Sequence, residues 1–386
     1  MTKQTNTPEL RFPEFKNEWS KLTMNDFLME DKQYGTQKDT NFPIVTSSRQ
    51  GLYIQNKYFE GDRSFANKNV TFSIVPINYF TYRHMSDDDI FKFNINKFNT
   101  PILVSKEYPV FTVKNTFSQN FIFYELNNNI RFLKFCRIQK KGGTRTRLYF
   151  KNLLQYQTYF PNYEEQQKIG VFFYKLDQQI ELEEKKLELL EQQKRGYMQK
   201  IFSQQLRFKD EKGNDYPKWI FKKFEEIFKV VPSKKYQIKS SEIEDNASIP
   251  VIDQGQNLIL GFSNNKEKVF NDFKNVIIYG DHTTVIKRSD KPFIIGGDGV
   301  KLLTSKVDSD ISYLYNALQY FNVKSEGYKR HFSILKNKDF YISTSIEEQK
   351  KIANIFNKLD KYIEKQFAKV ELLKQRKQGL LQKMFV

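Results

Sequence analysis

Residues 164–202 read EEQQKIGVFFYKLDQQIELEEKKLELLEQQKRGYMQKIF, and residues 347–385 read EEQKKIANIFNKLDKYIEKQFAKVELLKQRKQGLLQKMF. The two stretches align without a gap at a shift of 183 residues. Identical residues recur along the alignment, as in the pairs Asp177/Asp360 and Lys194/Lys377. An ungapped match of this length indicates that the chain contains an internal repeat.

Apolar residues recur in both stretches at steps of three, four or seven. They are Ile169, Phe173, Leu176, Ile180, Leu187 and Leu190 in the first, and Ile352, Phe356, Leu359, Ile363, Val370 and Leu373 in the second. This heptad-like stripe predicts two long amphipathic helices. A helix of about 39 residues spans roughly 58 Å, more than a small domain can cover. We therefore expect the two helices to form an antiparallel coiled coil. Two independent surface helices are the alternative, which the narrow stripe disfavours.

A second repeat precedes each variable segment. Leu10-Arg11-Phe12 leads to Trp19, and Leu206-Arg207-Phe208 leads to Trp219. We call the segment from Leu-Arg-Phe to the tryptophan the opening. The chain therefore contains two copies of the order opening, variable segment and long helix. Because the opening near the N-terminus would continue from the last helix, the repeat is circular, and we expect the two ends of the chain to lie close together.

The variable segments, residues 29–160 and 229–343, contain short β-rich runs, among them residues 70–75, 120–124 and 275–279. Glycine-containing turns punctuate these runs. We predict an α/β (α+β) chain in which two globular domains are separated by two long helices, with pseudo-twofold circular symmetry. The expected boundaries are 1–162 for the first domain, 163–205 for the central helix, 206–345 for the second domain and 346–386 for the last helix.

The balance of charge suggests a polyanionic partner. The chain has 63 basic and 45 acidic side chains, a formal net charge of +18. Nucleic acid is the usual partner of such a surface, although a generally lysine-rich proteome would give the same composition. The single cysteine, Cys136, rules out an internal disulfide framework and a cysteine zinc site. The polar start and the lack of a long apolar run favour the cytoplasm and predict no membrane span.

The sequence offers no catalytic motif. It contains no Pro-Pro pair, which the Asn/Asp-Pro-Pro-aromatic motif of an adenine methyltransferase would include. It also contains no G-x-x-x-x-G-K-[ST] phosphate loop. The glycine run at residues 296–299 is expected to form a turn between strands. The three histidines show no metal spacing. We therefore expect no catalytic residue, no metal site and no cofactor in this chain.

Two variable segments, each followed by one of two similar long helices that open with Glu-Glu-Gln, resemble the specificity subunit of type I restriction–modification enzymes. The shared pattern lies at residues 164–180 and 347–363. The second copy departs from the first in having Thr344 where Pro161 stands.

The resemblance implies that each variable domain reads one half of a bipartite, asymmetric sequence in double-stranded DNA. It also implies two modification subunits, which methylate adenine with S-adenosylmethionine, and restriction subunits, which cut DNA with ATP and Mg²⁺. All of these cofactors would be bound by the partners.

Candidate DNA contacts are basic and amide side chains in predicted loops, because arginine and lysine bind phosphates and guanine while glutamine pairs with adenine. In the first domain they are Ser48, Arg49, Arg83, His84, Lys140, Lys141, Arg145 and Arg147. In the second domain they are Gln254, His282, Thr283, Lys287, Arg288, Lys329, Arg330 and His331. Arg147 and Arg330 correspond at the repeat shift. A solvated charged turn is the alternative for each cluster.

Two other functions remain open on the sequence. A self-contained enzyme would methylate or cleave DNA without partner subunits. The missing Pro-Pro motif argues against a methyltransferase. A protein scaffold built on the long helices would show no preference for any DNA sequence in a binding selection.

Overall fold

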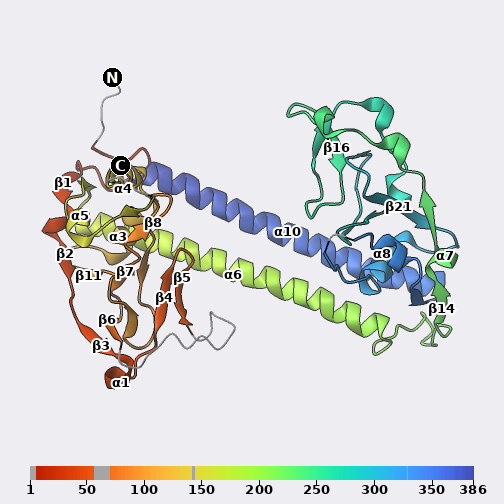
Figure 1. Ribbon diagram of the computed structural model, residues 1–386, viewed down its shortest axis with the longest axis horizontal. Helices are drawn as coiled ribbons and strands as arrows, with labels where there is room; N and C mark the ends of the chain where they lie inside the picture. The colour runs from red at the N-terminus through yellow and green to blue at the C-terminus, as the bar shows by residue number, and fades with distance from the viewer. Residues whose placement is uncertain (1–5, 56–69, 141–143, 328) are drawn as a thin grey trace. The chain divides into compact units, whose positions relative to one another are not determined.

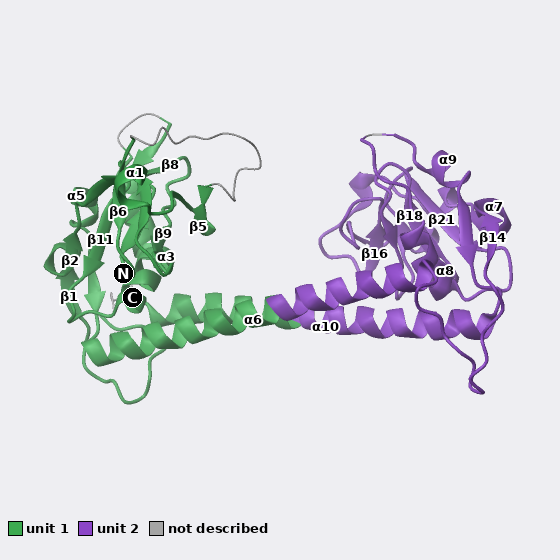
Figure 2. Cartoon of the chain, turned by 90° about the horizontal axis from the view of Figure 1, so that it is seen from below, with its two compact units in different colours: residues 1–184, 369–386 green, residues 185–368 purple. Residues whose placement is uncertain are grey.

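The computed structural model describes residues 6–55, 70–140, 144–327 and 329–386. The chain divides into two compact units (Figure 2). Unit 1 contains residues 1–184 and 369–386, and unit 2 contains residues 185–368. Both units combine strands and helices, which confirms the predicted mixed fold class.

The two repeated stretches form the long helices α6 (Tyr163–Phe202) and α10 (Ile346–Met384), drawn in yellow-green and blue in Figure 1. Their segments pair in opposite directions inside each unit. In unit 1, Lys377 lies 2.5 Å from Asp177 and Lys374 lies 2.8 Å from Glu184. These pairs confirm the predicted antiparallel arrangement there.

The same contact recurs in unit 2, where Lys194 lies 2.6 Å from Asp360. Asp360 and Lys194 are the repeat equivalents of Asp177 and Lys377. The identities at these four positions therefore correspond to two equivalent ion pairs, one in each unit.

The side chains of the predicted apolar stripe are shielded from solvent, and some of them pack into the cores of the globular domains rather than between the helices. All twelve side chains are buried or half-buried. Ile169 and Phe173 belong to the core of unit 1, and Ile352, Phe356 and Leu359 to that of unit 2. The far end of each helix also enters a core: Leu381, Met384 and Phe385 in unit 1, and Ile201 and Phe202 in unit 2. Each compact unit thus includes segments of both helices.

Unit 1 is built on antiparallel sheets. A four-stranded sheet has the order β2 (Leu28–Glu30), β11 (Val110–Val113), β7 (Phe80–Tyr82), β9 (Phe93–Ile95), and a three-stranded sheet has the order β10 (Ile102–Ser105), β6 (Thr71–Val75), β3 (Tyr34–Thr36). Three further pairs are β1 (Ser20–Thr23) with β13 (Gln157–Phe160), β4 (Val45–Ser48) with β5 (Gly51–Ile54), and β8 (Met85–Ser86) with β12 (Thr146–Arg147). The helices are α1 (Gln37–Thr40), α3 (Gln119–Asn128), α4 (Ile130–Ile138) and α5 (Phe150–Leu153).

Unit 2 repeats much of this plan. Its four-stranded sheet has the order β15 (Phe228–Val231), β21 (Val300–Ser305), β18 (Ile277–Gly280), β19 (Ile286–Lys287). A three-stranded sheet has the order β17 (Gly261–Ser263), β16 (Ile249–Ile252), β20 (Ile294–Ile295), with β16 and β20 parallel. β14 (Ile220–Lys223) pairs with β22 (Asp339–Ile342), and the helices are α7 (Phe224–Ile227), α8 (Ile311–Tyr320) and α9 (Phe332–Leu335).

One predicted strand is wrong. Residues 120–124 lie in α3, not in a strand, because Ser118 caps the helix by accepting a hydrogen bond from the N–H of Phe121. The side chains buried along α3 follow a helical step rather than strict alternation. The predicted strands at residues 70–75 and 275–279 are confirmed as β6 and β18.

The Glu-Glu-Gln motif joins each long helix to its domain. In unit 1, Arg11 of the opening donates two hydrogen bonds of 2.7 Å to the buried carboxylate of Glu165. Gln166 donates to the carbonyl of Pro161 (2.9 Å) and accepts from the N–H of Ser118 (3.1 Å). The opening, the start of α6 and the cap of α3 are therefore tied together.

In unit 2, the equivalent Gln349 donates to the carbonyl of Ser343 (2.8 Å) and accepts from the N–H of Asp310, the cap of α8 (2.9 Å). The buried Glu348 accepts from Trp219 Nε1 at 2.9 Å and from the hydroxyl of Ser343 at 2.6 Å. The two repeats thus share the motif, but different side chains donate hydrogen bonds to its buried glutamate: Arg11 to Glu165, and Trp219 and Ser343 to Glu348.

The opening near the N-terminus meets the end of α10 in unit 1, as the circular repeat predicts, while Met1 lies outside the described residues. The N–H of Leu10 donates to the carbonyl of Lys383 at 2.8 Å. The side chain of Lys383 lies 2.9 Å from Glu9. Asn129 donates to the backbone carbonyl of Val386 at 3.0 Å.

Gly170 marks a close helix crossing in unit 1. A Cβ at this position would lie 2.7 Å from the backbone nitrogen of Phe121, whereas a Cβ at Gly196 would meet no described atom within 4 Å. We expect Gly170→Ala to lower the free energy of unfolding by about 1–3 kcal/mol through overpacking. Gly196→Ala should instead raise it by up to about 1 kcal/mol through helix propensity. Urea unfolding followed by circular dichroism measures both, and stabilisation by Gly170→Ala would contradict the close crossing.

Glu125 gives unit 1 a pH dependence. Its carboxyl group is buried and accepts from Asn129 (2.9 Å) and from the hydroxyl of Tyr156 (3.1 Å). Burial raises the pKa of Glu125 to about 7, and the hydrogen bonds from Asn129 and Tyr156 only partly oppose this. Because the folded-state pKa is the higher one, its stabilisation is fully present below about pH 4.5 and is lost as the pH rises through about 7.

We therefore expect unit 1 to lose on the order of 3 kcal/mol of stability between pH 4.5 and pH 8 from this group. Glu125→Gln mimics the protonated form, so its unfolding free energy should vary less over that range. Urea titrations at several pH values test this. Identical pH profiles for the two proteins would show that Glu125 does not cause the dependence.

Candidate nucleic-acid interface

In unit 1, several predicted contacts surround a cleft of about 560 Å³. Ser48 and Arg49 stand at the turn of the β4–β5 hairpin, and Arg83 follows β7. The Arg49 guanidinium donates to Asp88 at 2.7 Å, and this pairing holds the pKa of Asp88 well below its usual range. Arg49 is thus oriented in advance by a carboxylate, although about half of its side chain stays exposed.

Of the other predicted cations of unit 1, Arg145 and Arg147 lie at the short β8–β12 pair, and Lys140 follows α4. Arg145 is held by Asp87 at 2.7 Å. Arg83, Lys140 and Arg147 are exposed, and no ion pair involves them within the described part of the chain. Such side chains can reach phosphates or base edges at little cost in lost protein contacts. The predicted contact Lys141 lies outside the described residues.

His84, another predicted DNA contact, is buried in unit 1. Its side chain is only 4% exposed, and its ring stacks on Tyr149 with centroids 5.4 Å apart. Burial lowers the pKa of His84, which favours the neutral ring. The exposed neighbours Arg83 and Arg147 are the groups at this place that can meet DNA.

In unit 2, four of the predicted contacts come together. Gln254 Oε1 accepts from the N–H of His282 at 3.1 Å, and the backbone carbonyl of Gln254 accepts from the hydroxyl of Thr283 at 2.5 Å. The His282 ring bonds through Nδ1 to the carbonyl of Lys329 at 3.1 Å. Lys329 and Arg330 are exposed beside this cluster. Three distant segments therefore present one polar, basic edge.

Two further predicted contacts in unit 2, Lys287 and His331, are buried. Lys287 is 5% exposed, because its ammonium donates to the carbonyls of Asp253 (2.9 Å) and Asn257 (2.5 Å). His331 is fully buried, with Nε2 accepting from the N–H of Glu326 at 3.0 Å and Nδ1 bonded to the carbonyl of Asp281. Both side chains fix loops and have no bonding capacity to offer a base.

Arg288 is held on α8. It donates to Ser312 at 2.8 Å, and its guanidinium lies 5.5 Å from the ring centre of Tyr315. Its side chain is half-buried, away from the cluster of hydrogen bonds around Gln254. Its contact with DNA stays a prediction.

The correspondence of Arg147 with Arg330 agrees with the backbone pairing. The residue after Arg147 donates its N–H to the carbonyl of His84, two residues after Tyr82 of β7. The residue after Arg330 donates to the carbonyl of Asp281, two residues after Tyr279 of the equivalent strand β18. The two units thus present an exposed arginine at equivalent positions.

Sequence reasoning missed two participants in the cleft of unit 1. Asp88 orients Arg49, and Lys92 lines the cleft opposite the hairpin. Asp88 lies in the run Asp87-Asp88-Asp89, but the sequence does not show which of these carboxylates meets Arg49, because the two residues are 39 positions apart.

Groups of histidine, cysteine, aspartate or glutamate that could hold a metal ion do not occur among the described residues. Within the same residues, no helix has the length and apolar character needed to cross a bilayer.

Comparison with known proteins gives concordant matches. The model of the family described as type I restriction modification DNA specificity domain matches residues 21–192 and again residues 216–373. The Escherichia coli type I restriction enzyme EcoR124I/EcoR124II specificity subunit is 33% identical over 93 residues. That alignment spans 23% of this chain and 23% of the curated relative.

Among solved structures, the S subunit of a type I restriction–modification system from M. genitalium has a similar fold, with a TM-score of 0.65 at 16% identity. The match covers 98% of this chain and 99% of that one. Since the specificity-domain model matches both halves of the sequence and most of its length, the chain belongs to the type I restriction–modification DNA specificity family.

Proposed function

We propose that this chain is the DNA-reading, non-catalytic subunit of a type I restriction–modification complex in the cytoplasm. Each unit reads one half of a bipartite target in double-stranded DNA. The observation that carries the proposal is the match of the specificity-domain family to both halves of a duplicated chain. The exposed arginines at equivalent positions, Arg147 and Arg330, support it, because phosphate and guanine contacts need such groups.

Two modification subunits are the partners that the duplication favours. Each repeat supplies the same helix with the same Glu-Glu-Gln start, so one docking surface occurs twice. Restriction subunits complete the complex, and S-adenosylmethionine, ATP and Mg²⁺ act on the partner chains. Native mass spectrometry of the reconstituted methylase should give two modification subunits per copy, and a saturated one-to-one complex would contradict this.

Methylation mapping tests the reading function. Cells carrying this gene with its modification subunits should methylate one bipartite sequence. Replacing residues 229–343 by the equivalent segment of another family member should change one half of that sequence and leave the other. Changes in both halves would contradict independent reading.

Two matched substitutions refine the test. Arg147→Ala should weaken selection of one half-site only, and Arg330→Ala should weaken selection of the other.

A purified chain that methylates or cuts DNA alone would favour a self-contained enzyme, and a chain with partners but no preferred sequence would favour a scaffold.

A further inference from the structure

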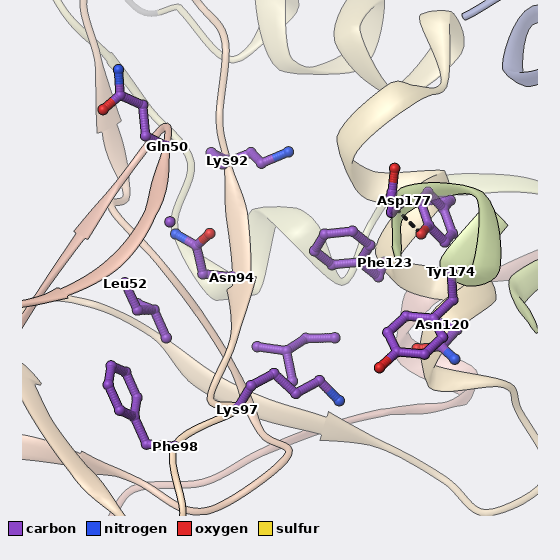
Figure 3. A pocket seen from close by; sticks show the side chains of 13 residues that line it. Gln50, Leu52, Lys92, Asn94, Lys97, Phe98, Asn120, Phe123, Tyr174 and Asp177 are labelled. Carbon is purple, nitrogen blue, oxygen red and sulfur yellow. Dashed lines mark hydrogen bonds between the residues drawn. The ribbon is translucent and has the colours of Figure 1, made fainter. Parts of the chain in front are cut away.

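Unit 1 contains a second pocket, of about 500 Å³, that none of the features above explains. It lies where β9, the β4–β5 hairpin, α3 and α6 meet (Figure 3). Lys92, Asn94 and Lys97 line it from the strand side, and Phe123 and Tyr174 from the helices. This volume suits a small organic ligand.

The charged groups at this pocket are unbalanced. Lys92 and Lys97 line it, and Lys377 adjoins it through its ion pair with Asp177. Asp177 is the one carboxylate among the lining residues, and it is already engaged by Lys377 at 2.5 Å and by the hydroxyl of Tyr124 at 2.7 Å. Burial and the nearby Lys377 lower the pKa of Lys92. Lys92 and Lys377 thus lie near one carboxylate, and Lys97, whose ammonium donates to Asn78 Oδ1 at 3.2 Å, adds a further positive charge to the lining. An anionic ligand group would therefore improve the local electrostatics.

Aromatic rings and amides form the rest of the lining. The ammonium of Lys92 lies 5.5 Å from the centre of the Phe123 ring, and Figure 3 shows this side chain extending towards Phe123 and Asp177. Tyr174 and Phe98 offer further ring surface, and Asn120 contributes an amide. Rings can stack on a planar base, and amides can pair with its edge.

We propose that this pocket binds a nucleoside 5′-monophosphate. The phosphate, which carries close to two negative charges at neutral pH, pairs with Lys92 beside Phe123, and the base stacks among the aromatic side chains. Binding of this ligand would be a function in addition to the proposed recognition of DNA. It also adjoins the reading hairpin, because Asn94 of the pocket donates to the hydroxyl of Ser47 and the carbonyl of Ser48, each at 2.9 Å.

Calorimetric titration of the full chain with 5′-AMP, 5′-GMP, 5′-CMP and 5′-UMP tests the proposal. At least one should bind with one-to-one stoichiometry. Its parent nucleoside and inorganic phosphate should each bind roughly tenfold more weakly or worse, since each lacks one of the two recognition elements. Absence of saturable binding by all four would overturn the proposal. Equally tight binding by a short single-stranded oligonucleotide without a terminal phosphate would also overturn it, because the site would then belong to DNA.

Two variants with opposite expected effects locate the site. Lys92→Met keeps the apolar stem and should weaken binding roughly tenfold. Asp177→Asn removes the one lining carboxylate and should tighten binding several-fold. Lys21→Met, an exposed lysine of β1 that does not line the pocket, is the control and should bind unchanged. Thermal unfolding checks that each variant is folded. Unchanged affinity in folded Lys92→Met or weaker binding in folded Asp177→Asn would overturn the assignment.

Discussion

Replacing Arg11 with alanine is expected to lower the free energy of unfolding of unit 1 by about 3–5 kcal/mol, because it leaves the charge of Glu165 buried without its partner. The side chain of Glu165 is 1% exposed, and both of its oxygens accept from Arg11 at 2.7 Å. Removing one member of a buried pair costs much more than the pair contributes as a whole, since the other charge stays away from water.

Arg207→Ala in unit 2 is the matched control. Arg207 is the repeat equivalent of Arg11, but its nearest nitrogen lies 3.8 Å from Glu348, too far for a hydrogen bond. Trp219 and Ser343 already donate to that carboxylate. Arg207 itself donates to the backbone carbonyls of Tyr216 (2.9 Å) and Pro217 (3.0 Å). The loss should therefore be smaller than at Arg11, on the order of 1–2 kcal/mol.

Urea unfolding of each single variant, with the transition of each unit followed separately, measures the difference. Equal losses in the two units would mean that the bidentate geometry at Glu165 does not decide stability. Arg11→Lys adds a second check. It keeps the charge but loses the fork that matches a carboxylate, so its loss should be intermediate.

The helices could be predicted from the sequence because their signals are local and repeated. The heptad stripe gave both helices and their length, and the identities at Asp177, Lys194, Asp360 and Lys377 are now explained as two reciprocal ion pairs. The circular order of the repeat likewise predicted the meeting of Leu10 and Lys383.

The candidate site could be predicted only in part, because exposure is a property of the fold. His84, Lys287 and His331 have the residue types of DNA contacts, but the fold buries all three side chains. The clustering of Gln254 with His282 brings together segments 28 residues apart. The strand predicted at residues 120–124 failed since a continuous apolar run fits a buried helix as well as a strand.

The reciprocal ion pairs also fix the register of the two helices. Seventeen residues separate Asp177 from Lys194, and the same step separates Asp360 from Lys377. Lys377 pairs with Asp177, and Lys194 pairs with Asp360. Four residues inserted into α6 alone, between Glu184 and Lys185, would lengthen one helix by about 6 Å relative to the other. One of the two ion pairs and the apolar packing beside it must then break, so we expect this variant to be destabilised.

Inserting four residues into both helices, after Glu184 and after Ala368, should keep both pairs. Four residues are close to one helical turn of 3.6, so the apolar stripe nearly keeps its face. Under the proposed function, the half-sites move apart by about 6 Å, and duplex DNA rises about 3.4 Å per base pair. The methylated target should therefore gain one or two base pairs in its unread spacer, with both half-site sequences unchanged. Methylation mapping measures this directly. An active double-insertion variant that keeps the original spacer would mean that the helices do not set the distance between the half-sites.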